Sequence, residues 1–201
     1  MKKTLLLVLT ILVFYQFSIG QEERSKGSFE FSVLGSEFVD KTSIGFSLAA
    51  STSWHEYFQI GFGFQSAFHS QENSFSYAVG SPYYTASALT INNIAQLYSI
   101  GDFFIEANAN FGVLNISLQD QDFQDFNPVL GISESEAIAQ EFFRLFQGGI
   151  TLSYIITKKD RANISIFVRT LNNQAFGNVR FGGKNGNSNF QFNLGIKLNA
   201  F

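Results

Sequence analysis

Four charged residues stand alone inside apolar stretches and are the first candidates for chemistry. They are Glu30 between Phe29 and Phe31, Glu106 between Ile105 and Ala107, Arg169 between Val168 and Thr170, and Lys197 between Ile196 and Leu198. Neighbouring residues in a strand face opposite sides, so each charge would lie on the polar face of its strand. An enclosed ion loses several kcal/mol of hydration and needs a partner. We therefore expect these two acids and two bases to form an internal charge network.

A group of carboxylates is the second candidate. Asp120, Asp122 and Asp125 fall close together and alternate with Phe123 and Phe126. Calcium takes about 6 to 8 oxygen ligands, so three side chains are too few. The group also lacks the glycine and the closing glutamate of an EF-hand loop. We expect a solvated acidic loop, with no metal and no cofactor.

The elements that would hold these residues follow from a strict alternation of apolar and small polar residues from Gly27 onward. A period of two is typical of strands whose faces meet different surroundings. Eight segments show it, at 27–38, 43–54, 57–68, 85–98, 103–118, 147–156, 162–171 and 189–200. Only the fourth is interrupted on its apolar face, by Asn92 and Asn93. The sequence predicts an all-β fold, an eight-stranded antiparallel up-and-down transmembrane barrel.

The composition of the two faces predicts which one points outward. The polar face carries mostly Gly, Ser, Asn and Gln, as at Gln59, Gly61, Gly63 and Gln65. A soluble barrel such as a lipocalin is the alternative, but its polar face would carry many lysines and glutamates. Charged residues make up 14% of this chain, whereas soluble domains average about 25%. We expect the apolar groups to face lipid and the small polar groups to fill the interior.

The predicted connections alternate between short and long. The short ones are 55–56, 100–102 and 157–161, and the long ones are 69–84, 119–146 and 172–188. Membrane barrels have short periplasmic turns and longer outer loops. Within the longest loop, Ser133 to Glu136 resembles a helix-capping box, and Ile138, Phe142 and Leu145 are spaced for one helical face. This predicts a short helix over the barrel mouth or against the membrane surface.

Closure of such a barrel makes its first and last strands neighbours. Glu30 and Lys197 would then meet near the periplasmic end. We expect a packed network that plugs the lumen, because an eight-stranded barrel is just wide enough for its own side chains. A gated polar path is the alternative. Aromatic residues at the strand ends, which favour the boundary between membrane and water, are predicted interfacial anchors: Trp54, Tyr57, Tyr83, Tyr84 and Tyr98.

The beginning of the chain is expected to direct export. Lys2 and Lys3 precede an apolar run, and Ser18 to Gly20 form a small-x-small cleavage site, so residues 1–20 are a predicted signal peptide and 21–201 one barrel domain. The chain has no cysteine, which excludes disulfides and a lipoprotein anchor. Without the two leader lysines, 11 basic residues face 16 acidic ones. The resulting net charge of −5 has the wrong sign for binding nucleic acid.

Taken together, these features resemble small outer-membrane β-barrel proteins of Gram-negative bacteria. The resemblance rests on the signal segment, the Phe-rich barrel and the closing strand from Phe190 to Phe201, and the leader ending at Gly20 is similar to those of Bacteroidota barrels. It implies the cell outer membrane, contact with lipid and lipopolysaccharide, and a possible place in a larger outer-membrane complex. In one departure, Phe201 is out of phase with the outward residues Ile196 and Leu198, whereas such barrels usually end on an outward phenylalanine.

Some barrels of this kind modify lipid A, and the deacylases among them place a histidine and a serine two apart, supported by a glutamate. The run from His69 through Ser70 to Glu72 has these residue types at the wrong spacing, and His55 lies in a predicted turn. We expect a non-enzymatic scaffold or binding protein that acts through outer loops carrying Tyr83, Tyr84, Phe123, Phe126 and Phe176. A lipid A-modifying enzyme and a narrow small-solute channel are the alternatives.

Overall fold

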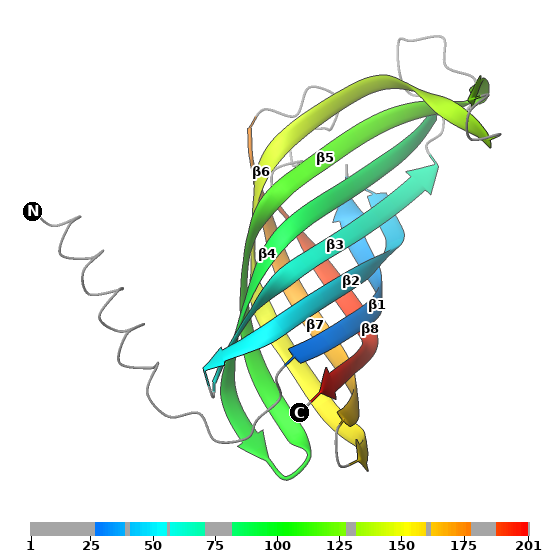
Figure 1. Cartoon of the computed structure of the whole chain (residues 1–201). Helices are drawn as coiled ribbons and strands as arrows, with labels where there is room; N and C mark the ends of the chain where they lie inside the picture. Colours follow the sequence, from blue (N-terminus) through cyan, green and yellow to red (C-terminus); the bar gives the residue numbers. More distant parts are fainter. Residues whose placement is uncertain are drawn as a thin grey trace, which may run out of the picture.

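Eight antiparallel strands form a closed barrel (Figure 1). The computed structural model describes residues 27–38, 41–55, 57–70, 82–127, 132–159, 162–177 and 188–200. The strands are β1 (Gly27–Phe38), β2 (Lys41–His55), β3 (Phe58–Ser70), β4 (Pro82–Ile100), β5 (Phe103–Asn127), β6 (Ile132–Lys159), β7 (Ala162–Phe176) and β8 (Ser188–Ala200). Each pairs with the next in sequence, and β8 closes the sheet onto β1. The predicted eight-stranded up-and-down barrel is confirmed. Within the ranges given, no helix is long and apolar enough to span a membrane.

Most strands begin and end within a few residues of the bounds that the alternation of apolar and small polar residues predicted. The predicted short turns are confirmed, because β2 and β3, β4 and β5, and β6 and β7 are each separated by two residues. Gly101 has a φ of 58° in one of these turns, a conformation that glycine adopts without a steric penalty. Asn92 and Asn93 do not interrupt β4. Asn92 is buried inside the barrel, and Asn93 on the outer side donates to the backbone oxygen of Ala109 at 3.0 Å.

The prediction of a long loop with a helix at 119–146 is wrong. β5 and β6 continue as a paired hairpin through this region, and Ser133 and Ser135 pair with β5 rather than capping a helix. Phe142 is 66% exposed on the outer side, whereas Leu145 is 4% exposed inside the barrel. One helical face cannot hold two residues that point to opposite sides of a sheet. In Figure 1, β5 and β6 rise beyond the other strands and curve over.

The register around the barrel fixes its tilt and its narrow bore. A path perpendicular to the strands leaves β5 at Leu114 and returns to β5 at Phe104, ten positions away. The cross-strand partners along this path are Ala88, Gln65, Ser47, Ser32, Gly195, Phe167 and Ser153. This stagger tilts the strands relative to the barrel axis and, for eight strands, leaves an interior that side chains can fill.

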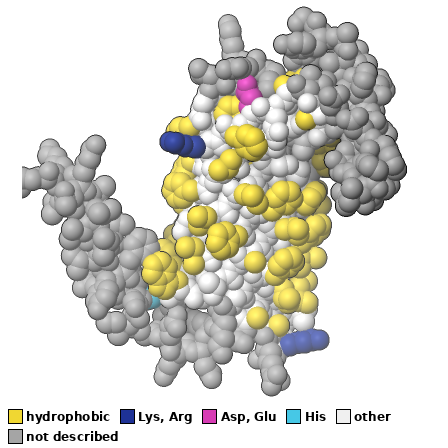
Figure 2. Space-filling view, turned by 45° about the horizontal axis from the view of Figure 1, so that its top comes forward, with side chains coloured by type: hydrophobic (Ala, Val, Ile, Leu, Met, Phe, Trp, Pro, Cys, Tyr) yellow, Lys and Arg dark blue, Asp and Glu magenta, His cyan; other side chains and the backbone are white. Residues whose placement is uncertain are grey.

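The outer surface of the barrel is apolar along most of its height. Large outward side chains are exposed on several strands, including Phe29 and Phe31 on β1, Phe62 on β3, Leu89 on β4, and Leu194 and Ile196 on β8. Figure 2 shows hydrophobic side chains spread over the barrel wall, with Lys and Arg side chains near its two ends. The alternating inward residues, such as Ser28, Glu30 and Ser32, are buried. The two faces of the sheet therefore have opposite chemistry.

Glycine occupies inward positions where neighbouring strands approach most closely. A Cβ added at Gly149 would lie 1.9 Å from the backbone oxygen of Thr170 on β7. At Gly35, on the outer side of β1, an added Cβ would meet nothing within 4 Å. Comparing an alanine substitution at Gly149 with one at Gly35 therefore separates the steric effect of a close neighbouring strand from the general effect of adding a methyl group.

We expect Gly149→Ala to destabilise the barrel by about 1 to 3 kcal/mol, because the backbone of β7 must move to admit the methyl group. Gly35→Ala should be neutral or slightly stabilising, since alanine restricts the unfolded chain at no steric cost in the fold. Urea unfolding in detergent micelles measures both. Equal stability of the two variants would show that the close approach at Gly149 does not constrain the barrel.

Candidate functional site

The barrel interior has three layers. Toward the short turns, next to a small hydrogen-bonded group of Ser28, Ser51 and Gln59, lie the charged residues of β1, β5, β7 and β8. Above them lies a belt of Asn and Gln side chains. We call the opposite end, where β3 connects to β4 and β7 to β8, the long-loop end. Toward this end, the interior becomes apolar on the side of β4 to β7. Each layer follows from the residue types at inward positions of the strands, so the polarity of the lumen changes along its axis.

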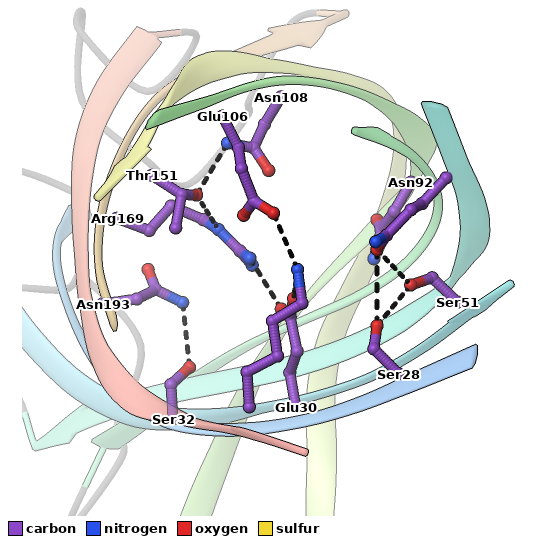
Figure 3. Close-up of polar contacts among 12 residues, drawn as sticks. Ser28, Glu30, Ser32, Ser51, Asn92, Glu106, Asn108, Thr151, Arg169 and Asn193 are labelled. Carbon is purple, nitrogen blue, oxygen red and sulfur yellow. Dashed lines mark hydrogen bonds and ion pairs between the residues drawn. The ribbon is translucent and has the colours of Figure 1, made fainter. Parts of the chain in front are cut away.

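The four predicted charges meet in the first layer and form what we call the charge tetrad (Figure 3). Arg169 Nη2 lies 2.6 Å from Glu30 Oε2, and Lys197 Nζ lies 2.9 Å from Glu106 Oε1. Lys197 Nζ also lies 3.5 Å from Glu30 Oε1. All four side chains are at least nine-tenths buried. Two acids and two bases thus balance their charge within the barrel wall.

The pairing within the tetrad differs in detail from the expected pair of Glu30 and Lys197. These two residues are cross-strand partners on β1 and β8, yet each has its shorter contact with another member. The stagger of the barrel brings Glu106 of β5 across the lumen toward Lys197. Such contacts across the lumen cannot be derived from the order of the strands.

Sequence reasoning missed the uncharged residues that orient the tetrad. Thr151 Oγ1 accepts hydrogen bonds from Arg169 Nε at 2.8 Å and from Asn108 Nδ2 at 2.7 Å. The Arg169 guanidinium also lies 4.8 Å from the ring centre of Phe167 on its own strand. The alternation of inward and outward residues along β5 and β6 places Asn108 and Thr151 inside the barrel. This alternation is the signal that could have identified them.

The amide belt closes the lumen above the tetrad. Gln147 donates to Asn173 at 2.8 Å, Asn173 donates to Gln191 at 3.1 Å, and Gln191 donates to Gln65 at 3.0 Å. Gln65 lies on β3 and Gln191 on β8, and these strands are not neighbours. Their hydrogen bond therefore crosses the lumen. Asn193 is tied to the belt as an acceptor from Gln191 at 2.8 Å.

The apolar layer contains a buried cluster at the long-loop end. Its members are Tyr84, Ala86, Ala88, Leu114, Ile116, Leu118, Phe143, Leu145 and Ala175. Polar residues predominate on the outer side of these strands: Thr85, Ser87, Asn115, Gln119, Gln140, Arg144, Asn172 and Gln174. Phe142 and Phe176 interrupt them, at 66% and 59% exposure, and Ser117 is buried. An apolar inside with a polar outside is the arrangement of a sheet in water. The polarity of the wall is thus reversed at this end.

The predicted aromatic anchors have two different environments. Trp54, Tyr57 and Tyr98 are 44 to 53% exposed near the short turns, and Tyr83 stacks against Phe68 with ring centres 6.2 Å apart. Tyr84 is fully buried in the apolar cluster, so its prediction as an interfacial anchor is wrong. Strand β4 begins at Pro82, and alternation turns Tyr84 inward once Tyr83 faces out.

Several predicted features lie outside the described residues. These are the signal peptide at 1–20, Phe201, and the part of the histidine motif beyond Ser70. The backbone at Asp120, Asp122 and Asp125 belongs to β5 rather than to a loop, but their side chains are not described. Among the described side chains, no three His, Cys, Asp or Glu residues are grouped to hold a metal ion. His55 Nδ1 accepts the Tyr57 backbone N–H at 3.4 Å.

Comparison with known proteins identifies the fold. No protein-family profile and no curated protein matches the sequence. The crystal structure of Ail, the attachment invasion locus protein of Yersinia pestis, in complex with the heparin analogue sucrose octasulfate, has a TM-score of 0.52 and 12% identity, over 89% of this chain and 100% of that one. The crystal structure of Neisserial surface protein A has a TM-score of 0.53 and 10% identity, over 87% and 94%. The chain is similar to these barrels in fold, and no match supports the narrower likeness to Bacteroidota proteins.

We expect Lys197→Met to destabilise the barrel by about 3 to 5 kcal/mol, because it leaves Glu106 buried without its cation. The matched control is Lys158→Met. Lys158 pairs with Asp102 near a short turn, where both side chains are partly exposed, and such a pair contributes about 1 kcal/mol or less. Adding Glu106→Gln to Lys197→Met should restore part of the loss. Unfolding of the wild type and the three variants in detergent measures these differences in stability. Equal stability of both lysine variants would show that the tetrad does not stabilise the barrel.

Proposed function

We propose that this protein is a non-enzymatic barrel of the Gram-negative outer membrane, exported by a signal peptide at residues 1–20. It acts as a membrane-embedded scaffold or binding protein through its outer end. The observation that carries the proposal is a lumen crossed by hydrogen bonds and ion pairs, inside a barrel with an apolar outer surface. The barrel wall then serves as an anchor, and its outer end is the part left free for recognition.

The exposed apolar surface supports membrane embedding. Phe62 is 74% exposed, Leu89 66% and Phe190 72%, on three different strands. Soluble monomers rarely expose contiguous apolar patches above a few hundred Å². In a bilayer the same side chains contact acyl chains, and the closed sheet leaves no unpaired strand edge in the hydrocarbon region.

The polarity reversal supports a water-exposed outer end. Above the apolar belt, the wall formed by β4 to β7 has polar groups outside and apolar groups inside. That part of the barrel therefore stands above the membrane as a rigid, hydrated platform. Binding residues are commonly presented by connections that such a scaffold holds in place.

Charge argues against the kind of ligand that is present in the Ail complex. Sucrose octasulfate is a dense polyanion, whereas this chain without its two leader lysines has a net charge of −5. We infer that the partner is a neutral glycan, the sugar region of lipopolysaccharide or a protein of the cell surface. A protein partner would place the barrel in a larger outer-membrane complex. Charge repulsion disfavours a sulfated polymer.

Two measurements separate the binding protein from a channel and from an enzyme. In planar bilayers, we expect the purified protein to give no conductance steps under conditions where a 16-stranded porin conducts, because the bonds of the amide belt and the charge tetrad cross its narrow lumen. Lipid A extracted from an expressing Gram-negative host should keep its mass. Reproducible steps would support the channel, and a mass change would support the enzyme.

Site-specific photocrosslinking in native outer membranes tests the outer end directly. A photoreactive amino acid replaces Gln140, which is exposed on β6 at the long-loop end, or Lys159, which is exposed at the opposite end of the same strand. We expect Gln140 to give a discrete adduct with lipopolysaccharide or a surface protein, identified by mass spectrometry. Adducts at Lys159 alone, or at neither position, would contradict recognition through the outer end.

A further inference from the structure

The hydrogen bonds of the amide belt all run in one direction around the barrel. Asn110 donates to Gln147 at 3.3 Å, and Gln147 donates to Asn173 at 2.8 Å. Asn173 donates to Gln191 at 3.1 Å, and Gln191 donates in turn to Asn193 at 2.8 Å. In each step the amide nitrogen of one residue meets the carbonyl oxygen of the next. Asn110 therefore stands at the beginning of this chain, where it gives a hydrogen bond without receiving one.

The carbonyl oxygen of Asn110 is left without a donor by this order. Asn110 is 4% exposed, and its Oδ1 atom is buried and accepts no hydrogen bond from the described residues. Turning the amide over does not help. The nitrogen of Gln147 is already bonded to Asn173, so Gln147 presents its oxygen to Asn110 and requires the Asn110 nitrogen there. A buried acceptor without a partner destabilises a fold, so this position calls for a donor from outside the chain.

A small polar cavity lies beside Asn110. Its lining residues come from the seven strands β2 to β8, which places it within the lumen. Gln65, Asn92 and Arg169 are among them, and most of the lining is polar. The cavity has a volume of about 10 Å³. One water molecule needs about 10 to 15 Å³ on the same measure, so the cavity has room for one water and for nothing larger.

The charges around this cavity select the class of occupant. A guanidinium carries five N–H donors, and the bonds of Arg169 to Thr151 and Glu30 engage two of them. An occupant beside Arg169 can therefore accept a hydrogen bond, while Asn110 Oδ1 requires one that donates. A cation would meet the positive charge of Arg169, and an anion would meet the carbonyl oxygen of Asn110. A neutral molecule that both donates and accepts suits both residues.

We propose that this cavity binds a single ordered water molecule, which donates to Asn110 Oδ1 and accepts from Arg169. Buried waters commonly make about three hydrogen bonds, and Asn92 or Gln65 supplies the third. Because Arg169 belongs to the charge tetrad, the water joins the tetrad to the amide belt. The belt and the tetrad then form one hydrogen-bonded network. The proposal concerns the lumen and holds whichever partner the outer end recognises.

Two measurements on the whole wild-type protein test the site. A crystal structure from detergent should show density for one atom at hydrogen-bond distance from Asn110 Oδ1, about 2.7 to 3.2 Å. In lipid nanodiscs, NOE and ROE spectra should show cross-peaks of a long-lived water with the side-chain amides of Asn110 and Asn92. An occupant about 2.3 to 2.6 Å from the oxygen would be a metal ion such as Ca²⁺, and this would overturn the proposal.

Matched variants locate the water at Asn110. Asn110→Leu removes the acceptor and should abolish both the density and the cross-peak at the Asn92 amide. Asn189→Leu is the control, because Asn189 accepts from Asn173 at 2.7 Å but does not line this cavity. It should keep both signals. If Asn110→Leu fails to fold, Ser47→Val takes its place, since it adds hydrocarbon to the cavity wall and should expel the water.

Three results would refute the site. The first is a wild-type protein with neither density nor a long-lived water signal at Asn110. The second is a protein group that donates directly to Asn110 Oδ1. The third is a water that persists unchanged at the Asn92 amide when Asn110 is replaced by leucine or when Ser47 is replaced by valine. Loss of the signals in these variants together with their retention in Asn189→Leu would support the proposal.

Discussion

Complete pairing of the backbone is the constraint on which the rest of this structure depends. Within a hydrocarbon layer, an unpaired N–H or C=O group costs several kcal/mol, so a sheet can exist there only if its first and last strands join. β1 and β8 satisfy this requirement through an unbroken register from Gly27 opposite Ala200 to Ser36 opposite Gln191. Closure then determines how much room is left inside, and that room decides which side chains the inward positions can hold.

The narrow bore explains why the described interior combines glycine, amides and a charge tetrad of equal numbers of acids and bases. Glycine stands where the backbones come closest, as at Gly149. Amides such as Gln147 and Asn173 both donate and accept, so they can satisfy one another without water. The charge tetrad obeys the same rule with ions, because Glu30 and Glu106 face Arg169 and Lys197 in equal number. Removing one member leaves a buried charge that no neighbour can compensate.

Most of the barrel could be predicted from the sequence because apolar and polar residues alternate regularly along the greater part of its strands. There, outward residues are apolar and inward ones are polar, so the parity of Glu30, Glu106, Arg169 and Lys197 indicated their side of the sheet. The pairing of Glu30 with Lys197 could be predicted from barrel closure, and it is present at 3.5 Å. The shorter contact between Lys197 and Glu106 could not be predicted, because it depends on the ten-residue stagger. That stagger is a property of all eight strands together.

The prediction failed where the surroundings of the strands change. Toward the end where β5 and β6 extend beyond the other strands, the inward positions hold apolar residues such as Ile116 and Leu145 instead of polar ones. Phe142 and Leu145 then stand on opposite faces, and the sequence loses the regular alternation that identified the other strands. The spacing of apolar residues happens to fit a helix as well. A single sequence cannot separate these readings without knowing where the lipid ends.

The same reversal gives the barrel two interiors with different uses. In the lower part, hydrogen bonds and ion pairs among Gln191, Gln65 and the tetrad cross the lumen and connect its walls. In the upper part, apolar contacts around Ile116 and Leu145 stabilise the wall from one side only, and the small residues opposite leave a space. The amide belt forms the boundary between them.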